Sequence, residues 1–246
     1  MKCVTGIRPS GSIHLGNYLG AMKQARELGS EVFIADLHGI HTPEEIETTY
    51  YALKALGIPS CKQSEFGHEH LKLYVHLQNY AAIGHLSRMT QYKEKGEKES
   101  ENALLLTYPV LMTADIFFKK ATHVPVGNDQ MQHIEFARDL HDRVKPDCPK
   151  PEAVIGQYPR IMSLTDGRKK MSKSDEDDMS RINLTDSADI IHKKVMVAKT
   201  AMDFHNETPE MINLKTIYKA VGGKENHTRF KEFKSELADL IIAELK

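Results

Sequence analysis

The chain has 246 residues, of which 40% are hydrophobic and 27% are charged, and this composition is typical of a globular protein with one or two domains. With 33 Lys and Arg against 34 Asp and Glu, the net charge of -1 excludes a strongly basic protein that wraps nucleic acid, although it leaves room for a local basic patch. Three widely separated cysteines, Cys3, Cys61 and Cys148, argue against a disulfide scaffold or a cysteine metal site.

The first part of the chain alternates between strand and helix patterns. A short β-branched run at 4–7 is followed by an Arg-Pro-Ser-Gly-Ser turn, a predicted helix over 14–28 and a second predicted strand over 31–35. This order is the beginning of a parallel α/β sheet. A helix is then predicted over 43–56, because a proline at its first turn and two acidic residues suit a helix N-terminus.

The pattern continues to about residue 178 with mixed elements. It predicts, in chain order, a helix over 70–82, an exposed charged loop over 92–102, an apolar helix over 103–119 that bends or restarts at Pro109, a strand end over 124–127, a helix over 130–144 and a short strand over 161–164.

Beyond residue 178 the pattern changes to helices without a strong strand signal. Helical periodicity occurs over 188–198, 209–221 and 229–245. We therefore predict an α/β domain over 1–178 and a small helical domain over 179–246.

No segment predicts a signal peptide or a membrane helix. The first six residues lack an apolar core, and the best apolar stretch, 103–118, carries Asp115 and is shorter than the ~20 residues that span a bilayer. We expect a cytoplasmic protein that does not bind membranes.

The first chemical signal is the turn and helix start at 10–17, Ser-Gly-Ser-Ile-His-Leu-Gly-Asn. His14 and Asn17 are three residues apart and share one face of the first helical turn. A helix N-terminus after a parallel strand presents free N–H groups that suit phosphate oxygens. Taken alone, the pattern is more typical of a capped surface helix with an incidental histidine.

The second signal is Lys-Lys-Met-Ser-Lys-Ser-Asp at 169–175, which follows the last predicted strand of the α/β domain. A solvated basic loop is the alternative interpretation. A specified five-residue string arises by chance in a chain of this size with a probability on the order of 10⁻⁴. His-Leu-Gly-Asn near the start and Lys-Met-Ser-Lys-Ser near the end of this domain resemble the signature pair of the class I aminoacyl-tRNA synthetases.

Further segments narrow the resemblance to the bacterial-type tryptophanyl-tRNA synthetases, over residues 2 to about 245. They occur in the family's order: Gly-Ile-Arg-Pro-Ser-Gly at 6–11, Gly-Asn-Tyr-Leu-Gly-Ala at 16–21, Met-Thr-Gln-Tyr-Lys-Glu-Lys at 89–95, Thr-Tyr-Pro-Val-Leu-Met-Thr-Ala-Asp-Ile at 107–116 and Val-Pro-Val-Gly-Asn-Asp-Gln at 124–130. The tyrosyl enzymes share the architecture but not the segment around Met112 and Asp115.

The resemblance implies a fold and a reaction. The fold is a Rossmann-like parallel-sheet catalytic domain with a helical insertion, followed by a small all-helical C-terminal domain. The activity is that of a tryptophan–tRNA ligase, with L-tryptophan, ATP and tRNA(Trp) as substrates and Mg²⁺ carried on the ATP phosphates. A homodimer is implied by the family alone.

Chemistry independently singles out the helix over 103–119. Tyr108, Met112 and Asp115 lie at i, i+4 and i+7 on one helix face, and a carboxylate among apolar residues needs a partner if it is buried. The resemblance implies that Asp115 accepts the indole N–H while Met112 contacts the ring. The alternatives are that Asp115 caps a helix broken after Pro109 or pairs with Lys119.

The resemblance assigns the remaining site residues. The amino-acid pocket comprises Gly6, His38, Tyr108, Met112, Asp115, Gly127, Asp129 and Gln130. ATP binding is assigned to Arg8, Ser10, His14, Gly16, Asn17, Lys170, Met171, Ser172 and Lys173, with Lys170, Lys173 and Lys95 as the catalytic phosphate contacts. His38, like His41, is also compatible with an ordinary strand-end histidine. We interpret His68-Glu69-His70 as a surface feature at a helix start, and we expect no metal site formed by the protein.

The chain departs from the family at several places. Asn128 stands where an acidic residue is common, Met131 where lysine is common, and Arg8 where glutamine is frequent. Arg8 is therefore compatible either with a phosphate contact or with a role that only makes the turn rigid. Family members usually continue beyond the position of Lys246 as long helices, so we expect a shortened C-terminal domain with weak charging of tRNA and little dependence on the anticodon. The alternative functions are a non-charging regulatory paralogue that binds tryptophan or ATP, and a tyrosine-specific relative.

Overall fold

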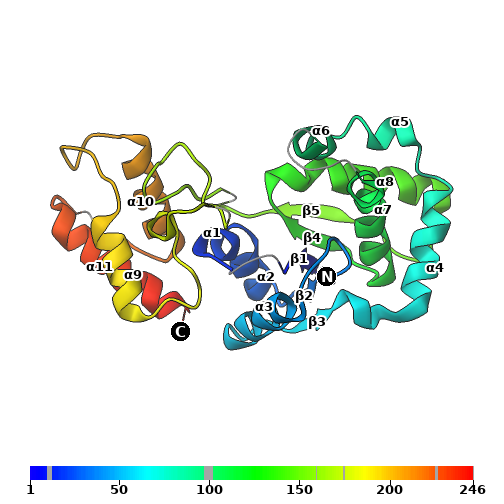
Figure 1. Ribbon diagram of the computed structural model, residues 1–246, viewed down its shortest axis with the longest axis horizontal. Helices are drawn as coiled ribbons and strands as arrows, with labels where there is room; N and C mark the ends of the chain where they lie inside the picture. Colours follow the sequence, from blue (N-terminus) through cyan, green and yellow to red (C-terminus); the bar gives the residue numbers. More distant parts are fainter. Residues whose placement is uncertain (10–12, 97–101, 159, 174, 225–226, 246) are drawn as a thin grey trace.

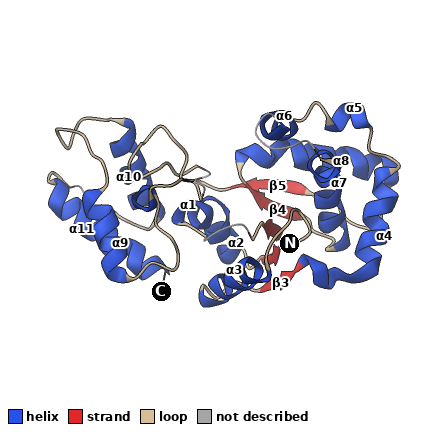
Figure 2. Ribbon diagram, in the orientation of Figure 1, coloured by secondary structure: helices blue, strands red, loops and turns tan. Residues whose placement is uncertain are grey.

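The computed structural model describes residues 1–9, 13–96, 102–158, 160–173, 175–224 and 227–245. A parallel sheet with its covering helices forms one end of the molecule (Figures 1 and 2). The other end is a helical lobe, which comprises the helices over 188–197, 209–220 and 230–245. The helices that follow the first two strands lie between these two ends. Within the described ranges, no helix combines the length and the apolar character needed to cross a membrane.

The strands form an open sheet in which all pairs are parallel. They are β1 (Val4–Ile7), β2 (Glu31–Ile34), β3 (Ser60–Lys62), β4 (His123–Val126) and β5 (Glu152–Ile155). β2 pairs with both β1 and β3, and β4 pairs with β5. A parallel bridge between Cys3 and His123 joins the two groups, giving the order β3-β2-β1-β4-β5. The connections change direction between β1 and β4, and open α/β sheets bind ligands at such switch points.

The described helices follow the predicted order closely. Their bounds are α1 (Leu15–Asn17), a π-helical turn η1 (Tyr18–Met22), α2 (Lys23–Glu27), α3 (Pro43–Ala55), η2 (Gln63–Phe66), α4 (Gly67–Gln78), α5 (Ile83–Leu86), α6 (Thr90–Gly96), α7 (Ala103–Phe118), η3 (Asn128–Gln130), α8 (Met131–Val144), η4 (Asp178–Ser180), α9 (Ala188–Val197), α10 (Pro209–Ala220) and α11 (Phe230–Leu245).

The capping signals explain where several of these helices begin. Thr42 accepts from the Glu45 backbone N–H and Glu45 bonds back to Thr42, so that α3 begins at Pro43 with a capping box. The predicted helix over 14–28 forms as α1, η1 and α2 in succession, and it ends at Gly29, where a positive φ of 61° favours glycine. α7 continues through Pro109 without restarting.

Two expectations about local structure were wrong, and two strands were missed. The predicted loop over 92–102 is helical as far as Gly96, in α6, and residues 97–101 lie outside the described ranges. The predicted strand over 161–164 is reduced to a single bridge between Met162 and Lys170. β3 and β5 were not predicted, because strands of three and four residues offer too few positions for a pattern.

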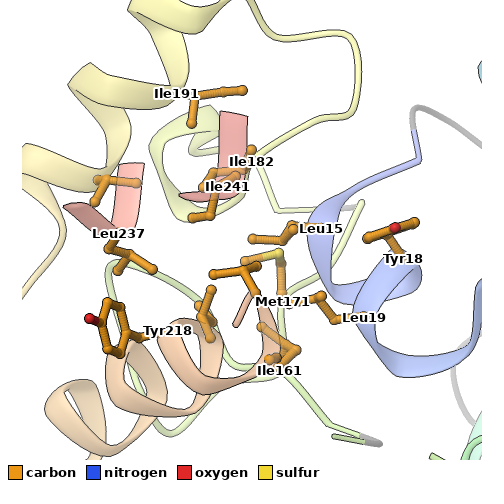
Figure 3. Packing of buried hydrophobic residues seen from close by; sticks show 14 of the residues in the cluster. Leu15, Tyr18, Leu19, Ile161, Met171, Ile182, Ile191, Tyr218, Leu237 and Ile241 are labelled. Carbon is orange, nitrogen blue, oxygen red and sulfur yellow. The ribbon is translucent and has the colours of Figure 1, made fainter. Parts of the chain in front are cut away.

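Two hydrophobic cores hold the fold. One lies between the sheet and helices α4, α7 and α8, and it includes Val4, Phe33 and Ile116. The other joins the helix after β1 to the helical lobe. Figure 3 shows this second core, in which Leu15 and Leu19 approach Met171 and Ile161, with Tyr218, Leu237 and Ile241 on the side of the lobe.

Segment 161–178 packs with the helical lobe, although we assigned it to the α/β domain. The Asn213 side chain accepts from the Met162 backbone N–H and donates to the Met162 and Ser163 carbonyls. Lys199 donates its backbone N–H to the Leu164 carbonyl at 2.9 Å. The division at residue 178 stays a prediction about domains, whereas these contacts join residues 162–164 to α10 and to the segment that follows α9.

Candidate active site

A cavity of about 260 Å³ opens at the switch point between β1 and β4. Its walls come from the two strands, from the segments that follow them and from one face of α7. Seven of the eight predicted amino-acid-pocket residues line it, namely Gly6, His38, Tyr108, Met112, Asp115, Gly127 and Gln130, together with Arg8 and Gln91 and an apolar surround of Val4, Phe33, Ala35, Ile116, Val124 and Val126. The predicted residues from distant segments therefore meet in one apolar cavity.

Two glycines in the cavity wall leave no space for a side chain. A Cβ at Gly6 would lie 2.6 Å from the Phe33 ring, and a Cβ at Gly127 would lie 2.6 Å from the Asp129 carboxylate. Because real Cβ contacts are not this short, the two glycines let these groups approach the backbone of β1 and β4.

Asp115 carries the only carboxylate that lines the described part of the cavity. Its Oδ1 accepts from Gln63 Nε2 at 2.6 Å and lies 2.7 Å from His70 Nε2, and its Oδ2 lies 3.0 Å from His38 Nε2. All four side chains are buried. Hydrogen bonds to a carboxylate offset the cost of its burial, so these donors make a buried Asp115 tolerable among apolar residues.

Both alternatives for Asp115 were wrong. The Lys119 ammonium bonds to Glu31 Oε1 at 2.7 Å instead. Asp115 occupies an interior position of α7 rather than a cap.

The interpretation of His68-Glu69-His70 as a surface feature is confirmed for His68 and Glu69 and was wrong for His70. His68 and Glu69 are exposed, but the His70 side chain is fully buried against Asp115. Gln63 was also missed. The available signal was periodicity, because His70 lies seven residues before the buried Leu77 and therefore on the same face of α4.

A network of polar side chains forms the rim beside the pocket. The Tyr108 hydroxyl donates to Gln91 Oε1 at 2.8 Å and lies 2.8 Å from His133 Nε2, and burial raises its pKa well above its usual range. Asp129 does not line the cavity. It accepts hydrogen bonds from the side-chain amides of Gln91 and Gln130, and both of these residues line the cavity.

The predicted helix start at His14 is a capped N-terminus. His14 Nδ1 accepts from the Asn17 backbone N–H at 3.2 Å, and Asn17 Oδ1 accepts from the His14 N–H at 3.3 Å. Since Nδ1 is an acceptor, the ring proton lies on Nε2. Burial lowers the pKa of His14 to about 4, and the positive charges of Lys173, Arg181 and Lys170 add to the effect. The imidazole is therefore a neutral donor at neutral pH.

Gly16 is the point where this helix meets the signature loop. A Cβ at Gly16 would lie 3.1 Å from the His14 ring and 3.3 Å from Met171 Cβ. The Met171 side chain is buried in the core, and its backbone N–H donates to the Ile161 carbonyl. Met171 therefore anchors the loop, and it can reach a nucleotide through its backbone only.

The signature lysines lie on either side of this anchor. Lys170 is exposed, and Lys173 is partly buried, which lowers its pKa to about 8. Across the described ranges, neither ammonium forms an ion pair. Ser172, between them, is also partly buried.

Arg8, Ser10 and Lys95 are the other predicted nucleotide contacts. Arg8 donates to the His38 carbonyl at 2.6 Å and lines the amino-acid cavity. Ser10 lies outside the described residues, and Lys95 lies in α6 with its side chain outside the described part of the chain. Among the described residues, no cluster of three or more His, Cys, Asp or Glu side chains has the arrangement of a metal site.

The geometry suits a ligand with two parts. The cavity accepts an apolar group that carries one hydrogen-bond donor for Asp115. The capped helix start and the unpaired lysine charges suit an anion such as a polyphosphate.

Comparison with known proteins agrees with this chemistry. The family model for tRNA synthetases class I (W and Y) matches residues 1–242. The tryptophan–tRNA ligase of Rickettsia bellii is 40% identical over 277 residues, which cover 99% of this chain and 84% of that protein.

Solved structures give the same result. The tryptophanyl-tRNA synthetase of Mycoplasma pneumoniae superposes with a TM-score of 0.82 at 30% identity, covering 99% of this chain and 86% of that one. The Campylobacter jejuni tryptophanyl-tRNA synthetase in complex with ADP and tryptophan has a TM-score of 0.76 at 28% identity, covering 100% and 86% of the two chains.

Proposed function

The chain belongs to the class I tRNA synthetases for tryptophan and tyrosine, and we propose how its cavity, helix start and signature loop divide the work of that family's reaction. The activity is that of an ATP-dependent tryptophan–tRNA ligase. A carboxylate oxygen of tryptophan attacks the α-phosphorus of ATP, and pyrophosphate leaves to give tryptophanyl adenylate. A ribose hydroxyl of tRNA(Trp) then attacks the acyl carbon, and AMP leaves.

The observation that carries the amino-acid assignment is the single carboxylate of Asp115 in a cavity whose lining is mainly apolar. An indole ring needs a large apolar site and one acceptor for its N–H, and this cavity supplies both. Met112 would contact the ring, while Gln130 and Tyr108 on the polar rim would face the α-amino and carboxylate groups. A cavity of this kind rejects phenylalanine, because that side chain leaves a buried acceptor without its donor.

The nucleotide would lie between the His14 helix start and the signature loop. His14 and Asn17 would hold phosphate oxygens through neutral donors. Lys170 and Lys173 would neutralise the charge that develops on the leaving pyrophosphate, and Lys95 would add a phosphate contact. Phosphoryl transfer of this kind depends on positioning and on charge stabilisation more than on acid–base groups.

Mg²⁺ would enter as part of the ATP substrate. Its oxygen ligands would be the phosphates and water, which is the usual coordination for this ion at phosphate sites. The protein's contribution would then be to position the metal–nucleotide complex through His14, Asn17 and the loop lysines.

We also propose a homodimer that forms through α4 and the segment after it. Leu71, Val75 and Ile83 have exposed fractions of 48%, 60% and 70%, and Leu71 and Val75 lie one helical turn apart on α4. Apolar side chains that share a face are typical of a subunit interface. In sedimentation we expect a mass of about twice 27.8 kDa, and Leu71→Glu should reduce it to the mass of the monomer.

The use of ATP and tRNA supports a cytoplasmic location.

Amino-acid-dependent exchange of pyrophosphate into ATP tests the proposed function. We expect exchange with tryptophan and little or none with tyrosine or phenylalanine. Charging of a tryptophan tRNA in the same preparation then tests the second step. Exchange driven best by tyrosine would reassign the substrate. Binding of tryptophan and ATP without exchange would indicate a regulatory protein instead.

A further inference from the structure

Two buried residues behind the cavity contact Asp115 without reaching the cavity themselves. Gln63 and His70 both bond to Oδ1, at 2.6 and 2.7 Å, and neither lines the cavity. His38, which does line it, bonds to Oδ2 at 3.0 Å. The carboxylate therefore has its Oδ1 turned toward the protein interior and its Oδ2 on the side of the cavity.

The number of lone pairs makes the two oxygens different. Each carboxylate oxygen accepts about two hydrogen bonds. Oδ1 already accepts from two donors, so it is fully used. Oδ2 accepts from one donor, so one acceptor position remains, on the side of the cavity. This position is free for a single N–H donor of a ligand.

The orientation of Gln63 is fixed by its second hydrogen bond. Its Oε1 accepts from the Leu37 backbone N–H at 3.2 Å, which leaves Nε2 to donate to Asp115. Gln63 opens η2, directly after β3, and its side chain is fully buried. The sheet therefore determines where this donor lies.

The orientation of His70 is fixed by aromatic packing. The His70 ring packs in a T-shaped arrangement against Phe66 and Phe118, with ring centroids 5.3 Å and 5.5 Å apart. These two phenylalanines stack on each other. Its Nδ1 is buried with no hydrogen-bond partner in the described part of the chain. With its other nitrogen unpaired, the contact to Asp115 is the one polar interaction of the ring there.

We propose that His70 and Gln63 are positioning residues for amino-acid selection, which rests on the proposed function: by occupying both acceptor positions of Oδ1, they prevent rotation of the Asp115 carboxyl group and reserve one position of Oδ2 for the indole N–H. His70 acts through Asp115 and touches no substrate. Its replacement should therefore reduce discrimination for the N–H group rather than amino-acid binding in general.

The test compares tryptophan with its sulfur isostere, β-(benzothiophen-3-yl)alanine, which has nearly the same shape and no N–H. Dissociation constants for both are measured by calorimetry with the full chain, and no turnover is needed. The chain contains no tryptophan, so the fluorescence change of L-tryptophan on binding provides an independent measurement without an indole signal from the protein. In the parent protein, tryptophan should bind more tightly than the isostere.

His70→Leu should lower the preference for tryptophan over the isostere about tenfold, since an unpositioned acceptor loses most of a hydrogen bond to the ligand. His70→Gln keeps an Nε2 donor at a similar reach and should restore much of the preference. His76→Leu makes the same change at an exposed position of the same helix and should leave the preference unchanged.

An equal loss of affinity for both ligands in His70→Leu, with the preference unchanged, would show a structural role and overturn the proposal. An increased preference would overturn it as well, since it would mean that a less satisfied carboxylate simply binds the N–H more strongly. If His70→Leu does not fold, Gln63→Met removes the other Oδ1 donor and the same outcomes apply. Tryptophan-dependent exchange by the parent separately reports on the proposed function.

Discussion

The amino-acid cavity and the signature loop differ in how their charges are compensated. In the cavity, the Asp115 carboxylate is buried and contacts three side-chain donors before any ligand arrives. In the loop, Lys170 and Lys173 form no ion pair within the described residues, and the pKa of Lys173 is lowered to about 8 by burial. The carboxylate in the cavity thus has hydrogen-bond partners within the protein, whereas the signature loop holds positive charge that the described residues do not pair.

The difference matches the two tasks of the reaction. Amino-acid selection requires an acceptor whose position is set in advance, because specificity depends on one hydrogen bond being made or lost. Stabilisation of a leaving pyrophosphate requires charge that becomes paired only as the reaction proceeds. Substitutions in the two regions should therefore affect different kinetic constants.

The largest effect is expected in the loop. Lys173→Ala and Lys170→Ala should each lower the single-turnover rate of adenylate formation on the order of 10²-fold, because a fixed charge that acts on the transition state is removed. The dissociation constant of ATP should change much less. Rapid-quench measurements at saturating ATP provide the rate.

Lys169→Ala is the matched control for these variants. It removes an equal charge from an exposed position in the same loop, and it should leave the rate within a few-fold of the parent. A Lys173→Ala defect that appears only in the ATP dissociation constant would contradict the distinction between the two regions.

The next largest effect is expected in the cavity. Asp115→Asn keeps the shape of the side chain, but with its one oxygen held by Gln63 and His70 an NH₂ group takes the place of Oδ2 and cannot accept the indole N–H. We expect KM for tryptophan to rise about 10- to 100-fold, from a cost of about 1–3 kcal/mol, with KM for ATP nearly unchanged. Pyrophosphate exchange at varied tryptophan and at varied ATP separates the two constants. Equal tryptophan kinetics in variant and parent would refute the assignment.

A second contrast, between local sequence signals and tertiary contacts, explains how much of the fold could be predicted from the sequence. Elements with a strong local signal, such as α3 with its first-turn proline and acidic residues and β1 with its β-branched residues, were predicted close to their observed bounds. β3 has three residues and exists because β2 pairs with it, and Met162 lies in a segment whose partners come from α10. Such elements depend on tertiary contacts that a local pattern does not contain.

The residues of the site show the same difference between local signals and tertiary contacts. Asp115 could be found from its motif and from its place on an apolar helix face. Gln63 and His70 carry no motif, and their role depends on η2 and α4 packing behind α7. The partial burial of Lys173, which lowers its pKa, also follows from the packing of the loop and not from its sequence.

A smaller effect is expected from the acidity of Lys173. With its pKa at about 8, the ammonium loses its proton above that pH, so kcat/KM for ATP should fall with increasing pH and approach a tenfold decrease per pH unit by pH 9 to 10. Lys173→Arg keeps its charge over this range and should give a flatter profile, although at a lower absolute rate. Profiles of exchange between pH 7 and 10 measure the effect. An equally steep decline in Lys173→Arg would assign the ionisation to another group.

The smallest effect at neutral pH concerns His14, which lies beside the loop lysines. Its folded-state pKa of about 4 is below the ordinary value of 6.5, so between these values the unfolded chain binds a proton that the folded chain does not. The free energy of unfolding should therefore fall as the pH is lowered through this window, by about 2 kcal/mol from His14 between pH 7 and pH 5. His14→Asn keeps a capping side chain and removes the titration, so its loss of stability over the same interval should be smaller by that amount. Urea denaturation of both proteins at pH 7 and pH 5 measures the difference. An identical pH dependence in the two proteins would mean that the imidazole accepts a proton as readily in the folded protein as in the unfolded chain. The conclusion that His14 is a neutral donor at the helix start would then be wrong.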